Sequence, residues 1–122
     1  MNLFFVKKSI QFLTFSIIMT NNYNEPLFDL VLREDNVEIR KYGENIIAKT
    51  SLRDGDISQN NSMFRKLANY IFGHNSESKK IPMTTPVMTK YDKNYYDMIF
   101  FMLDSKEIKH LPKPSNQDVI LE

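Results

Sequence analysis

The chain has 122 residues, of which 42% are hydrophobic and 25% are charged, a composition typical of a single globular domain. Sixteen basic and fifteen acidic side chains nearly cancel, so we expect no nucleic-acid partner held by phosphate neutralisation. The absence of cysteine excludes disulfides, thiolate nucleophiles and cysteine-based metal sites, and three glycines leave no glycine-rich phosphate-binding loop.

Residues 1–20 differ from the rest because they carry two lysines and no acidic side chain. The apolar-leaning run from Ser9 to Thr20 has twelve residues and as a helix would span roughly 18 Å, short of the roughly 30 Å hydrocarbon core. A cationic start before a short apolar run predicts a signal-like leader or membrane anchor, although Ile18 to Thr20 is a poor cleavage site. We therefore expect an exported or membrane-associated protein, with a packed or disordered extension of a cytoplasmic protein as the alternative.

A polar linker, residues 21–26, ends in a proline and predicts a domain that starts at residue 27. Beyond it, alternating apolar residues predict half-buried strands at 27–33, 37–42 and 46–52. The polar, turn-forming residues between these segments indicate an antiparallel meander.

The strand expected at 37–42 has two chemically different faces, because successive side chains point to opposite sides of a sheet. Its alternation places Val37 and Ile39 on one face. The other face carries Glu38, Arg40 and Tyr42.

The apolar period changes from two to 3.6 residues after residue 56 and predicts one helix from Ser58 to Phe72. Gly73 stands at the position where helices commonly end. The apolar face of this helix is formed by Ile57, Met63, Phe64, Leu67, Ala68 and Ile71.

Two prolines make residues 81–91 an extended edge or irregular strand. The run 98–103 is apolar on both faces and needs cover on both sides. A rigid extended segment at 111–114 and a short strand at 119–121 follow. The pattern predicts an α+β fold, with one flanking helix on a mainly antiparallel sheet.

One helix of about fifteen residues can cover one face of a sheet but not both. The run 98–103 is therefore expected to leave an apolar patch exposed. This patch predicts self-association through the exposed sheet, or a second layer supplied by a partner or by further chain.

Few residues suit catalysis or metal binding. Zinc catalysis normally needs three protein ligands, whereas the only histidines are His74 and His110, which are far apart in sequence. No G-x-S-x-G motif is present, and the paired carboxylates fall on polar turns. The strand methionines, Met102 among them, are interpreted as core residues, although thioethers can ligate haem iron. We predict no catalytic residue, no metal site and no enzyme.

Four segments carry a pattern that extends over nearly all of the chain after the leader. They are Val37-Glu38-Ile39-Arg40-Lys41-Tyr42, residues 64–73, Lys80-Ile81-Pro82-Met83-Thr84-Thr85-Pro86-Val87 and Leu111-Pro112-Lys113-Pro114. In this order and spacing they resemble the SOUL haem-binding protein family, and the third segment is the most specific. Residues 27–122 are therefore expected to form a SOUL-like domain.

The resemblance implies a twisted, barrel-like sheet with two flanking helices, built from two similar halves. It also implies non-covalent binding of haem or another porphyrin without catalysis. Family members continue through a second helix and further strands, so the end at Glu122 implies a partial domain. Some members have a histidine proposed as an iron ligand where this chain has Lys41, and a protonated lysine is a poor ligand.

A porphyrin needs an apolar platform for its macrocycle and cations for its propionates, and the predicted helix offers both. The candidate cofactor-binding residues are Met63, Phe64, Leu67, Ala68 and Ile71 for the macrocycle, with Arg65 and Lys66 for the propionates. The same apolar face is also what would pack on the sheet as core. The alternative function is a truncated, binding-defective fragment, or a general small-molecule effector-binding module that acts through dimerisation or a partner.

Overall fold

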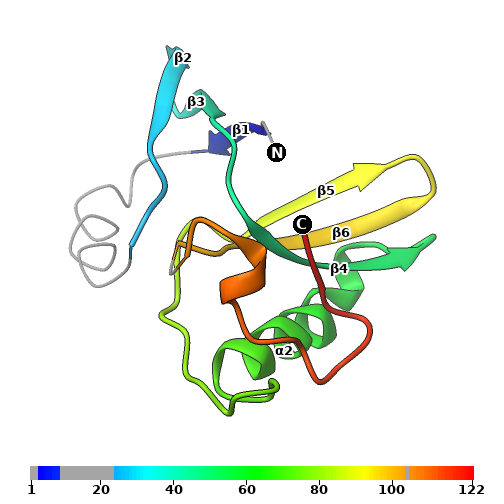
Figure 1. The fold of residues 1–122 in the computed structure, drawn as a ribbon. Coiled ribbons are helices and arrows are strands. Elements are labelled where there is room, and N and C mark those ends of the chain that lie inside the picture. The colour runs from blue at the N-terminus through cyan, green and yellow to red at the C-terminus, as the bar shows by residue number, and fades with distance from the viewer. Residues whose placement is uncertain (1–2, 9–23, 104) are drawn as a thin grey trace.

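The computed structural model describes residues 3–8, 24–103 and 105–122, which form two antiparallel sheets and one α-helix (Figure 1). The first sheet has the order β1-β3-β2, with strands at Leu3–Lys8 (β1), Phe28–Glu34 (β2) and Val37–Tyr42 (β3). The second has the order β5-β6-β4-β7, with strands at Ile47–Arg53 (β4), Met88–Asp92 (β5), Tyr95–Phe101 (β6) and Ile120–Leu121 (β7). The helix α2 spans Asn60–Ile71, and short 3₁₀ helices occupy Ile57–Gln59 and Ile108–His110. The predicted α+β fold with one flanking helix is confirmed, and the described strands form open sheets.

The leader predicted at residues 1–20 lies only partly within the described ranges. Leu3–Lys8 form β1, which pairs antiparallel with β3 from one end to the other. Residues 9–23 lie outside the described part, and so does the apolar run from which membrane association was predicted. No helix within the described ranges is long and apolar enough to cross a bilayer.

The predicted strand positions are correct, but the predicted meander is wrong at its third strand. β2 and β3 form the expected hairpin, with Asp35 at φ 47° in the turn. β4 pairs instead with β6 and β7. Within β4, the adjacent residues Ile47 and Ala48 point to opposite faces of the sheet, yet both are fully buried. The central position of β4, between β6 and β7, explains why both of its faces are covered. Alternation defines the faces of a strand, not its neighbours.

Helix α2 confirms the predicted helix, and a capping box that precedes it sets its start. The Asp56 side chain accepts a hydrogen bond from the Ser58 amide at 2.8 Å. The Gln59 side chain accepts one from the Asp56 amide at 2.7 Å. At the other end Gly73 has φ +115°, a conformation that costs a side-chain-bearing residue free energy.

The second sheet is covered on both faces, so the prediction of an exposed apolar patch at 98–103 is wrong. Met98 and Phe100 face α2, within the main core cluster. On the opposite face Phe101 lies in a second cluster, its ring 5.2 Å from that of Tyr42 at the end of β3. The first sheet therefore supplies the second layer. Exposed apolar residues lie on β2 instead, at Leu30, Val31 and Leu32.

The Lys80–Val87 segment connects several elements by hydrogen bonds. The Ile81 amide donates to the Ile71 carbonyl at the end of α2. The Thr84 hydroxyl donates to the Phe101 carbonyl at 2.6 Å, and the Thr85 amide donates to Asn24. The most specific part of the sequence pattern therefore joins the helix, β6 and the linker.

Candidate functional site

A groove lies where the chain passes from β3 of the first sheet to β4 of the second. It consists of two pockets, of about 580 and 390 Å³, which share Glu44, Asn45 and Leu103. We call it the junction groove. Both volumes lie in the range of roughly 300–1,000 Å³ that is usual for small-molecule sites.

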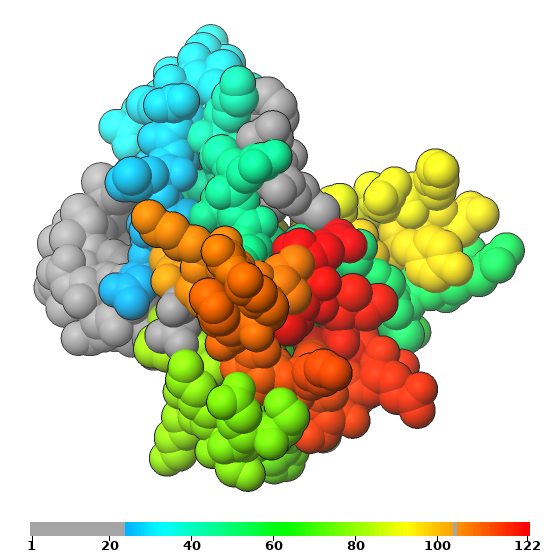
Figure 2. Space-filling view, in the orientation of Figure 1, coloured from blue at the N-terminus to red at the C-terminus, as the bar shows by residue number. Residues whose placement is uncertain are grey.

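Backbone hydrogen bonds bring three distant segments together around the larger pocket. The Met102 amide donates to the Ile46 carbonyl at 2.8 Å, and Ile47 exchanges two bonds of 2.9 and 3.0 Å with Glu122. In the space-filling view the segment near residues 105–110 and the C-terminal end lie side by side (Figure 2). This site could not be predicted from the sequence because its walls are far apart along the chain.

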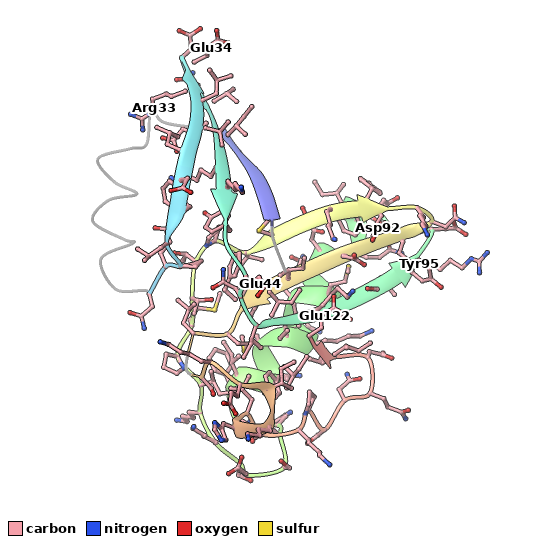
Figure 3. The ribbon with its side chains drawn as sticks, turned by 45° about the horizontal axis from the view of Figure 1, so that its top comes forward. Arg33, Glu34, Glu44, Asp92, Tyr95 and Glu122 are labelled. Atoms are coloured by element: carbon pink, nitrogen blue, oxygen red, sulfur yellow. The ribbon has the colours of Figure 1, made fainter. Side chains whose placement is uncertain are left out.

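The larger pocket has an apolar floor and a charged rim. The floor is formed by Ile46, Met102 and Leu103. The rim carries Glu44, Asn45, Ser105, Lys106 and Glu122. Figure 3 shows Glu44 on the β3–β4 connection and Glu122 on the neighbouring C-terminal segment. The arrangement suits a ligand with an apolar body and a polar edge.

The smaller pocket extends the groove toward the linker. Glu25, Pro26 and Leu27 form its far wall, opposite Gly43. Pro26 is buried, whereas Leu27 is almost fully exposed beside the opening. The groove therefore continues beyond Leu103 as an open channel in which Pro26 and Leu27 lie beside polar residues.

A buried charged network stands behind this wall, on the β3 face that carries Glu38, Arg40 and Tyr42. Arg40 donates to Glu38 at 2.8 Å and to Glu25 at 2.9 Å. Its guanidinium lies 4.0 Å from the centre of the Phe28 ring, a cation–π contact. Glu38 is 3% and Arg40 7% exposed.

The network changes the protonation properties of its members. Arg33 also donates to Glu38, and this hydrogen bond lowers the pKa of the Glu38 carboxyl, with Arg40 adding to the effect against the opposing influence of burial. Burial raises the pKa of the Tyr42 hydroxyl. The network fixes Glu25, and with it one end of the junction groove. In the sequence, this network is indicated by the oppositely charged Glu38 and Arg40, which are two residues apart and therefore lie on one face of the strand.

The seven residues predicted from the helix separate into two groups. Four of them point into the core between α2 and the sheet, which is the core-packing role considered for this face: Met63, Leu67, Ala68 and Ile71. The other three reach the surface. Phe64 is 41% exposed with its ring 5.4 Å from Phe100, Arg65 is exposed, and Lys66 donates to Asp118 at 3.0 Å. None of the seven lines the junction groove.

The two histidines lie on the surface and apart from the groove lining. His74 follows Gly73 at the end of α2, and its amide donates to the Asn69 carbonyl. The side chain of His110 is 63% exposed and stands 3.9 Å from Glu107. Within the described ranges, no group of three or more histidine, cysteine, aspartate or glutamate residues could hold a metal ion.

Residues 23–122 match the family described as SOUL heme-binding protein. No curated protein matches the chain. The matched range contains β2 to β7, helix α2 and every residue that lines the junction groove. It also contains all four segments on which the resemblance was based, and it covers most of the sequence. The chain therefore belongs to the SOUL heme-binding protein family.

Proposed function

We propose that this chain binds haem or another tetrapyrrole non-covalently, in the junction groove, and catalyses no reaction. The observation that carries the proposal is a groove of about 580 Å³ with an apolar floor, in a chain of a haem-binding family. A protein that binds a tetrapyrrole needs an apolar surface for the macrocycle and a polar opening for its carboxylates. The lining of the larger pocket combines three apolar residues with the charged residues Glu44, Lys106 and Glu122.

The lining fits the macrocycle. Ile46 and Leu103, both partly exposed, offer aliphatic surface along the floor, whereas Met102 is almost fully buried. Lys106, on the rim, is a cation that a propionate can reach from the same pocket. The open side leaves room for the second propionate in water.

The lining offers little to the iron. Among the described lining residues there is no histidine or tyrosine, and the Met102 thioether is only 2% exposed. A bound haem would supply redox and ligand-binding chemistry through its iron, but we derive no step from it. The protein's own contribution is to hold the macrocycle by apolar contact and to orient its carboxylates.

The expected affinity is modest. Burying several hundred Å² of macrocycle at about 25 cal/mol per Å² yields on the order of 10 kcal/mol. Association itself costs about 4–15 kcal/mol. Binding without an iron–protein bond should therefore be micromolar or weaker.

The predicted helix residues define a second location for the same ligand. Phe64 and Arg65 are exposed next to each other, with Lys66 beside them and Met63, Leu67, Ala68 and Ile71 packed beneath. An exposed ring beside a cation can contact the edge of a porphyrin. We place the ligand in the junction groove because that location combines volume with an apolar floor. A general small-molecule effector site is the alternative use of the same groove.

The test is a titration of the full chain with hemin, followed at the Soret band. Asn45→Trp should fill the groove from its wall and weaken binding, whereas the control Phe64→Ser changes only the helix location. Circular dichroism would verify that both variants remain folded. A flat titration of folded wild-type protein would overturn the proposed function. If Phe64→Ser weakened binding and Asn45→Trp did not, the ligand site would be assigned to the helix instead of the junction groove.

A further inference from the structure

The junction groove carries more acidic than basic side chains. Its lining includes three glutamates, at positions 25, 44 and 122, and one lysine, Lys106. Two of the glutamates have cationic partners. Arg40 donates to Glu25 at 2.9 Å, and Lys49 donates to Glu122 at 2.9 Å. Glu44 and Lys106 are the remaining charged residues on the described lining.

The positions of these charges limit how many carboxylates a ligand can bring. Lys106 can neutralise one carboxylate at the rim of the larger pocket. A further carboxylate that turns toward the β3–β4 connection meets Glu44, which lines both pockets. Like charges in one site disfavour binding, and such repulsion is a common means of rejecting a competing ligand.

On the basis of the proposed function, we propose that the charge of the rim selects tetrapyrroles with few carboxylates and rejects polycarboxylate porphyrins. Lys106 attracts one carboxylate, and Glu44 repels the others. Ligands whose two carboxylates lie on one edge can place both near Lys106 and the solvent. Porphyrins with carboxylates around the whole ring cannot keep all of them away from Glu44.

The size of the effect follows from exposed charge interactions. Each such interaction changes affinity by about two- to fivefold near neutral pH and low salt. The repulsive contributions of several carboxylates add up, so the most highly charged porphyrin should bind about tenfold more weakly than the dicarboxylate. Added salt should reduce this difference, because exposed charges are screened over about 10 Å at 0.1 M.

The experiment compares protoporphyrin, coproporphyrin and uroporphyrin, which carry two, four and eight carboxylates, by porphyrin fluorescence at low salt. Wild-type protein should bind them in that order of decreasing affinity. Glu44→Lys should strengthen binding of coproporphyrin and uroporphyrin by about two- to fivefold. Lys106→Gln should weaken binding of protoporphyrin by a similar factor.

A matched control keeps the net charge change but moves it away from the groove. Asp92→Lys alters the end of β5, far from Glu44 in Figure 3. Equal affinities for the three porphyrins, or the same effect of Glu44→Lys and Asp92→Lys, would overturn the charge selection while binding itself stands. Failure of all three porphyrins to bind folded protein would overturn the proposed function together with this inference.

Discussion

Replacement of Arg40 by methionine tests whether the buried charged network holds the first sheet together. Methionine keeps much of the apolar stem that lies over Phe28 but removes the guanidinium. Glu38, 3% exposed, then loses a hydrogen bond of 2.8 Å, and Glu25 loses one of 2.9 Å. A buried carboxylate would be left with Arg33 as its remaining partner in the described network.

The magnitude follows from this geometry. Removing one member of a buried ion pair typically costs about 3–5 kcal/mol. Arg33 still donates to Glu38, although its side chain is 54% exposed, so we expect the low end of that range, about 3 kcal/mol. With a urea dependence of about 1–3 kcal/mol per molar, the unfolding midpoint should fall by about 1–3 M.

The assay is urea unfolding followed by circular dichroism, since the chain has no tryptophan. Arg33→Met is the matched control, and its exposed side chain should cost less than about 1 kcal/mol. The double variant Glu38→Met with Arg40→Met should recover much of the loss, because no buried charge remains unpaired. Equal losses from Arg40→Met and Arg33→Met would refute the reasoning.

Two further predictions concern stability. The buried Thr50 hydroxyl has no hydrogen-bond partner within the described structure, so Thr50→Val should raise the free energy of unfolding by about 1 kcal/mol. In contrast Thr84→Val, which removes the bond to the Phe101 carbonyl, should lower it by about 1 kcal/mol, and thermal melts that rank the two alike would contradict this. The pKa of Glu38 is lowered on folding from its usual 4.5, so its contribution is present above that pH and is lost as the pH falls toward the folded-state pKa. Glu38→Gln should therefore show a smaller loss of stability on acidification below about pH 5 than wild type, and parallel curves would exclude this role.

The sequence predicted the elements well and their assembly only in part. Periodicity located the strands and α2, since the side-chain period follows directly from backbone geometry. The partner of β4 could not be predicted in this way. The pairing of Glu38 with Arg40 on one strand face is visible in the sequence, but their burial is not, because charged residues on a strand face are usually exposed.

The candidate site was harder to predict than the fold. The apolar face of the helix is real, but Met63, Leu67 and Ile71 are enclosed by the sheet. Residues that look like a ligand platform in sequence are equally suited to a core. The larger pocket of the junction groove is built from residues 44–46, 102–103, 105–106 and 122, which have no shared period or motif. Only their backbone hydrogen bonds reveal that they meet.

The contact between the two sheets has a mechanical consequence. No described strand of one sheet is hydrogen-bonded to a strand of the other, so the angle between them depends on side chains, on the β3–β4 connection and on the backbone bond from Thr85 to Asn24. Tilted aromatic rings form the side-chain contact between the sheets: the Tyr42 ring lies 5.5 Å from that of Phe28 and 5.2 Å from that of Phe101. Leu103, which lines both pockets, packs against the same cluster, so a change in this ring contact would be transmitted to the junction groove.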